Sequence, residues 1–145
     1  MFYVSCMLVR ESITGYPADS RIQKPEDLYR IATEVLNLDK ASEEYAYAIH
    51  VDTKNKVIGV HEISHGNLNT SVVHPREVFK TALLNNAYAI FLIHNHVSGD
   101  MTPSKDDISL TTKLKEAGEM LGIMLLDHII VSNTGFLSIK EEGIL

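Results

Sequence analysis

Two histidines one residue apart, His94 and His96, close an apolar run, and Asp107 follows them after a short turn. Residues 89–93 are apolar without polar alternation, which is typical of a strand buried on both faces. Side chains two positions apart on a strand point the same way, so the histidines share a face at the strand's C-terminal end. Ligands collect at such ends in open α/β sheets. Two imidazoles and a carboxylate, with a fourth position open, would make a catalytic zinc site.

Two simpler interpretations compete with the metal centre. Ser104 and Asp107 are spaced as in a capping box, so starting a helix would by itself account for both residues. His94 and His96 could be core histidines bonded to backbone. The close succession of two histidines, a turn containing glycine and proline, a serine and an aspartate favours the metal site.

The full string resembles a known motif. His94-x-His96, seven residues and Ser104-x-x-Asp107 are similar to the JAMM motif of the JAB/MPN metalloprotease superfamily, and HNHVSGDMTPS resembles its bacterial RadC-type branch. Residues 62–87 and 126–132 resemble the same branch, so the resemblance covers nearly the whole chain. Val97 stands where the family usually has proline, a departure that loosens the turn without removing a ligand.

The resemblance implies a zinc-dependent metallopeptidase-like hydrolase. Zn²⁺ would be held by His94, His96 and Asp107, and a water on the metal would attack an amide or isopeptide bond of a peptide or protein substrate. Glu62 would be the general base, and Ser104 would donate a hydrogen bond to the oxyanion. The expected fold is a three-layer α/β sandwich with a mixed sheet, the JAB/MPN architecture, which is similar to that of cytidine deaminases.

Glu62 lies on an expected strand over residues 56–64. By the two-residue period it shares a face with Ile58 and Val60. A carboxylate on that face lies either at the solvent-exposed end of the strand or inside a site. Only the resemblance selects it as the base. His61 and His65 fall on the opposite face and are interpreted as bystanders.

The remaining pattern supplies the elements that would position these residues. Helices are expected over residues 25–38, from Pro75, and over 104–121 with Gly122 as the stop; strands over 2–9, 45–52, 56–64 and 89–93, and in a hairpin over 123–139. Residues 66–73 form a polar connection that could line one side of the cleft. This mixed order of elements favours a three-layer α/β sandwich formed as one domain over residues 1–145.

Asp127 and His128 lie inside an apolar stretch of the hairpin, where buried polar groups need partners. An aspartate that holds the outer nitrogen of a metal-bound histidine is a common supporting device. The pair is therefore a candidate support for the metal centre.

Composition excludes several classes of protein. The net charge is −6 and no Lys/Arg cluster occurs, so a general polyanion binder is not expected. The single Cys6, expected to be a small buried hydrophobe, excludes an intramolecular disulfide and a multi-cysteine zinc site. An apolar run of about 18 residues and a signal peptide are both missing, which predicts a cytoplasmic protein with no membrane span.

Two other functions stay open at this point. A DNA repair or DNA-processing accessory role is attached to RadC-type proteins, but the charge gives it little support, and the N-terminal helix-hairpin-helix region of longer RadC proteins is expected to be missing. A metal-binding interaction module without catalysis is the second, because some JAB/MPN domains have lost their ligands. Every ligand position is filled here. No feature of the sequence names the substrate or indicates an oligomeric state.

Overall fold

The computed structural model describes residues 1–17, 19–66 and 73–145. Most of the expected connection over 66–73 therefore lies outside the described residues. The elements in chain order are α1 (Pro25–Arg30), a π-helical turn η1 (Ile31–Val35), a 3₁₀ turn η2 (Leu38–Lys40), β1 (Tyr45–Val51), β2 (Val57–His65), α2 (Pro75–Leu84), β3 (Ala89–Asn95), α3 (Lys105–Leu121), β4 (Met124–Ser132) and β5 (Gly135–Ser138).

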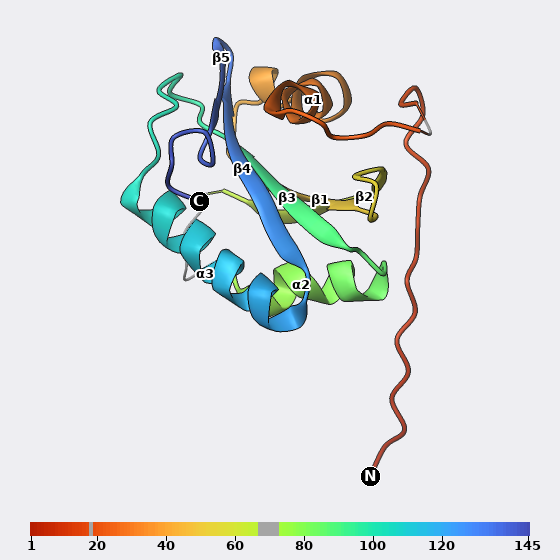
Figure 1. Ribbon diagram of the computed structural model, residues 1–145. Coiled ribbons are helices and arrows are strands. Elements are labelled where there is room, and N and C mark those ends of the chain that lie inside the picture. The colour runs from red at the N-terminus through yellow and green to blue at the C-terminus, as the bar shows by residue number, and fades with distance from the viewer. Residues whose placement is uncertain (18, 67–72) are drawn as a thin grey trace.

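The five strands form one mixed sheet in the order β2-β1-β3-β4-β5. β3 and β4 are parallel and are joined by α3, whereas every other neighbouring pair is antiparallel. α1 covers one face of the sheet, and α2 and α3 cover the other (Figure 1). The predicted three-layer α/β sandwich with a mixed sheet is confirmed.

β3 runs through the centre of the molecule, and all seven of its residues are buried. Its side chains alternate between two cores, because successive residues of a strand point to opposite faces. Ile90 and Leu92 pack with α2 and α3, whereas Phe91 and Ile93 pack with α1. His94 continues the even-numbered series, so the strand delivers its imidazole to the face that α3 covers.

The predicted start of α2 and both predicted ends of α3 agree with the structure. α2 starts at Pro75, whose fixed φ suits a first helical position. α3 follows the N-cap Ser104 and ends at Gly122, which adopts the left-handed conformation with φ 74°. No helix within the described ranges is long and apolar enough to cross a bilayer.

The helix predicted over residues 25–38 is wrong in its second half. Regular α-helix ends at Arg30 and continues as a π turn, in which the Leu36 N–H donates to the Ile31 carbonyl. The Thr33 hydroxyl donates to the carbonyls of Tyr29 and Arg30, a local bond that competes with the regular ladder and bends helices.

The strand predicted over residues 2–9 is also wrong. Among the residues that the structure describes, this segment has no strand partner, and it runs away from the sheet in Figure 1. Its apolar side chains are exposed except for the half-buried Leu8, and Cys6 is also exposed and is not the buried hydrophobe that was expected. A preference for extended backbone becomes a strand only where a neighbour supplies hydrogen bonds.

Candidate metal centre

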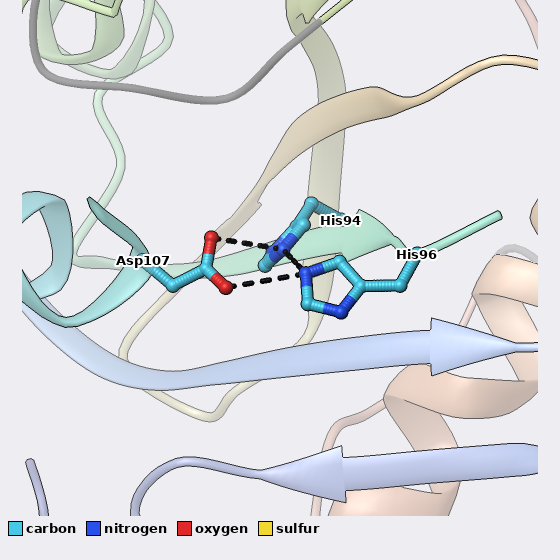
Figure 2. Close-up of side chains that lie close together, drawn as sticks. All are labelled: His94, His96 and Asp107. Atoms are coloured by element: carbon cyan, nitrogen blue, oxygen red, sulfur yellow. Dashed lines mark hydrogen bonds and ion pairs between the residues drawn. The ribbon is translucent and has the colours of Figure 1, made fainter. Parts of the chain in front are cut away.

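Three donor atoms converge at the C-terminal end of β3 (Figure 2). His94 Nε2 lies 2.9 Å from His96 Nε2, and each nitrogen lies 3.2 Å from a carboxylate oxygen of Asp107. The three ligand atoms fall within 4.8 Å of one another, so together they could hold a metal ion. His94 and Asp107 are almost completely buried, at 1% and 2% exposure. The structure thus brings together the three residues that the spacing singled out.

Asp107 is oriented by the start of α3. The Asp107 N–H donates to the Ser104 hydroxyl at 3.0 Å, and the Ser104 N–H donates to Asp107 Oδ2 at 2.8 Å. This is a complete capping box. Cap and cluster therefore share one residue: the cap fixes the Asp107 carboxylate with its oxygens toward the histidines, and the helix N-terminus favours its negative charge.

The ring of His96 has a defined tautomer. Its Nδ1 lies 2.7 Å from the backbone carbonyl of Asp100. A carbonyl can only accept, so Nδ1 carries the proton and Nε2 of the neutral ring is a bare lone pair. That lone pair faces His94 and the Asp107 carboxylate. Such electron-rich atoms repel one another unless a proton or a metal cation lies between them.

Burial and the contacts between the histidines and Asp107 shift the pKa values of these residues in opposite directions. Burial lowers the pKa of His94, and the hydrogen bond to Asp107 opposes that shift. The hydrogen bond to Asp107 raises the pKa of His96, whose ring is more accessible. Burial would raise the pKa of Asp107, but the two imidazoles outweigh it and hold that pKa below its usual range. A carboxylate that stays ionised and an imidazole that stays neutral are both ready to ligate a metal.

The geometry fits zinc. Bonds of about 2.0–2.1 Å in a tetrahedral shell place neighbouring donor atoms about 3.3 Å apart. The triangle formed by His94, His96 and Asp107 has sides of 2.9, 3.2 and 3.2 Å, so a small outward movement would suffice. Two imidazoles and one carboxylate suit zinc and leave one tetrahedral position open.

The structure does not bring Glu62 into this group. Glu62 pairs with Tyr47 across β1 and β2, and the Tyr47 hydroxyl donates to it at 3.4 Å. His94 pairs with Ala46, the residue before Tyr47. Neighbouring residues of β1 point to opposite faces, so Glu62 lies on the α1 face and His94 on the α3 face. The predicted role of Glu62 as general base has no geometric support.

A different glutamate, Glu44, lies beside the centre. It precedes Ala46 by two residues and thus shares the face of His94, and the ladder extends to it because the Gly66 N–H donates to its carbonyl. Glu44 is half-buried. Asp107 raises the pKa values of His94 and His96 more strongly, and the negative charge of Glu44 raises them further.

Asn95 fixes the chain at this point. Its side chain points away from the ligands, as the strand alternation predicts, and its amide bridges the start of β1 by accepting from the Tyr45 N–H at 2.7 Å and donating to the Glu43 carbonyl at 2.9 Å. The residue between these two contacts is Glu44. A cavity of ≈ 410 Å³ opens beside it, lined by Glu43, Glu44, His65, Gly66 and Val97.

Asp127 and His128, the predicted supporting pair, make different contacts. His128 Nε2 is 2.6 Å from His94 Nδ1, so His128 contacts a ligand directly. Asp127 accepts from the Ser138 hydroxyl and from the backbone N–H groups of His128 and Lys140, and so ties the C-terminal turn to β4. The expected aspartate-to-histidine contact is replaced by a histidine-to-histidine contact.

The sequence is similar to known proteins. The family model of the RadC-like JAB domain matches residues 22–144. A UPF0758 protein of Clostridium perfringens is 46% identical over 97% of this chain and 61% of its own length. A UPF0758 protein of Clostridium botulinum is 47% identical over 88% of this chain and 55% of its own length. A UPF0758 protein of Desulfitobacterium hafniense is 46% identical over 95% of this chain and 60% of its own length. The chain thus spans less than two thirds of each of these relatives. Because the family model matches most of the sequence, the chain belongs to the RadC-like JAB domain family.

Proposed function

We propose that this domain is a metal-dependent hydrolase that cleaves an amide or isopeptide bond of a peptide or protein substrate. One observation carries the proposal: potential ligand atoms of His94, His96 and Asp107 lie within 4.8 Å of one another in a largely buried position. Zinc held there would supply Lewis acidity and lower the pKa of a water from about 15.7 toward ~7.

Glu44 is our candidate for the general base, in place of Glu62. It is half-buried, lies on the face of the ligands and borders the cavity of ≈ 410 Å³. A carboxylate in this position can take a proton from the attacking water and return it to the leaving amine.

Ser104 is the candidate donor to the oxyanion. Its oxygen accepts the Asp107 N–H, so its hydroxyl proton remains for a second partner. The residue is exposed and stands one helical turn before Asp107, at the rim of the centre. A fixed donor at this rim would stabilise negative charge that develops on a substrate carbonyl.

The first test measures metal content by elemental analysis. We expect about one zinc per chain in the wild type and strong loss in His94→Ala and Asp107→Asn. Asparagine keeps an oxygen that can accept from the Ser104 N–H, so the cap survives while the charge is lost. A wild type that takes up no zinc when zinc is supplied would overturn the metal centre.

The second test separates the two glutamates with peptide and isopeptide substrates. Glu44→Gln should retain zinc and lose about 10²–10⁴-fold in kcat, while Glu62→Gln stays close to the wild type. The opposite result would return the role of base to Glu62. Zinc binding with no hydrolysis of any substrate would favour a metal-binding interaction module.

A further inference from the structure

A buried chain of hydrogen bonds runs behind the metal ligands. His94 Nδ1 lies 2.6 Å from His128 Nε2, and His128 Nδ1 lies 2.6 Å from the Thr111 hydroxyl. That hydroxyl lies 2.6 Å from the backbone carbonyl of Asp107. The chain therefore begins at one ligand and ends at the backbone of another. His128 and Thr111 are 0% and 1% exposed, so water does not compete for these bonds.

The direction of every bond follows from the last acceptor. The Asp107 carbonyl has no proton, so Thr111 donates its only hydroxyl proton there. The Thr111 oxygen must then accept from His128, which places the proton of that ring on Nδ1. His128 is 0% exposed, and its two ring nitrogens contact the His94 imidazole and the Thr111 hydroxyl, neither of which is an anion, so the buried ring is neutral. Its bare Nε2 can only accept, so His94 Nδ1 carries a proton and donates it.

The consequence for His94 is a fixed tautomer. With its proton on Nδ1, the lone pair lies on Nε2, the atom that faces His96 and Asp107. The opposite tautomer would place a proton where the metal belongs. The same chain also connects three elements, since His94 is on β3, Thr111 on α3 and His128 on β4.

We propose that Thr111 and His128 are positioning residues that hold His94 in the tautomer and orientation needed to ligate the metal. This inference rests on the proposed metal centre. Groups that accept the outer proton of a metal-bound histidine typically contribute 10–100-fold in metal affinity. The alternative, that the two residues only satisfy each other inside the core, predicts an effect on folding without an effect on metal binding.

The test compares three threonine variants. Thr111→Val has nearly the same shape and lacks the hydroxyl, whereas Thr111→Ser keeps it. Thr112→Val is the matched control, because the exposed Thr112 makes the same bond to the carbonyl four residues back, at Ile108, and has no place in the chain. Zinc affinity is measured by competition with a chelator, the cobalt absorption spectrum reports ligand geometry, and unfolding of the metal-free protein reports stability.

We expect Thr111→Val to weaken zinc binding about 10–100-fold and to change the cobalt spectrum. Thr111→Ser and Thr112→Val should both bind as the wild type does. Zinc affinity that is unchanged in Thr111→Val would overturn the positioning role and leave the metal centre standing. Failure of the wild type to bind zinc would overturn both, so the two failures are distinguishable.

A measurement on the unmodified protein covers the case in which Thr111→Val does not fold. Nitrogen-15 NMR of the imidazoles, recorded on the metal-free wild type near neutral pH, separates the two neutral tautomers. We expect His94 and His128 both to carry the proton on Nδ1. A proton on Nε2 of His128 would contradict the directed chain.

Discussion

His50 gives a quantitative test of burial in this fold. It lies on β1 at 2% exposure, and its Nδ1 accepts from the Asn85 side-chain amide at 3.1 Å. Within the described part of the chain, its Nε2 has no hydrogen-bond partner. Burial, with a smaller contribution from His61, lowers the pKa of His50 from 6.5 to about 4. The folded protein therefore keeps this ring neutral at pH values where the unfolded chain protonates it.

The sign and size of the effect follow from proton linkage. Between the unfolded pKa of 6.5 and the folded value of about 4, the unfolded chain binds more protons, so the free energy of unfolding falls as the pH falls. Above 6.5 both states are neutral and His50 contributes no pH dependence. At about 1.4 kcal/mol for each unit of pKa, acidification from about pH 7 to about pH 4.5 costs about 2 kcal/mol through His50 alone.

The assay is urea unfolding of the metal-free protein at these two pH values. The wild type should lose about 2 kcal/mol more than His50→Gln, whose neutral amide has no proton equilibrium in this range. His74→Gln, which removes an exposed histidine, is the control and should follow the wild type. Equal losses in the wild type and His50→Gln would refute the reasoning that burial holds this imidazole neutral.

Three further variants test the frame around the centre by denaturant unfolding. Gly118→Ala would place a Cβ 2.4 Å from the Ile123 carbonyl oxygen, so we expect a loss of about 2 kcal/mol; an unchanged midpoint would mean that α3 can move outward. Ser104→Ala removes the N-cap acceptor of α3 and should cost about 1 kcal/mol, and no cost would argue against the capping box. Asp127→Asn disturbs a carboxylate that accepts the Ser138 hydroxyl at 2.6 Å, so it should cost about 2 kcal/mol yet leave zinc content intact; loss of zinc would contradict its placement away from the ligands.

The three candidate metal ligands were predictable because their positions depend on local features. His94 and His96 stand at the end of one buried strand, and Asp107 stands in the first turn of the next helix. A two-residue strand period, a turn and a helix cap determine these positions, and each leaves a signature over a few residues. The order of the elements then predicts the layers of the sheet.

Glu44 could not be found in this way because its place beside the ligands depends on the pairing of β1 with β3, two strands that are distant in sequence. The faces of β2 were not predictable either, because its pairing with β1 contains two irregularities, one next to Val51 and one next to Tyr47. As a result Ile58 packs with the α2 and α3 core, whereas Val60 packs with the α1 core, although the two-residue period predicts a common face. Bulges shift the alternation without an obvious sequence signal. Only the paired strands show that Glu44 shares the face of the ligands.

The segment over residues 2–9 shows that a local preference for extended backbone is not enough to form a strand. Its apolar, β-leaning residues predict a strand, yet most of them lie in solvent. Propensity describes how well a residue suits a pleated, half-buried surface, and such a surface requires a neighbouring strand. The sequence around Phe2 shows a preference for extended backbone, but it does not show whether a neighbouring strand is available.

The crossover from β3 through α3 to β4 also affects how the centre forms during folding. Its residues run without interruption from Ala89 to Ser132 and include all three ligands, the cap, Thr111 and His128. Contacts between segments close in sequence cost little loop-closure entropy and form early. Glu44 joins from a distant part of the chain, only when β1 pairs with β3. We therefore expect refolding chains to acquire the ability to bind metal before the carboxylate that would act on water is in place.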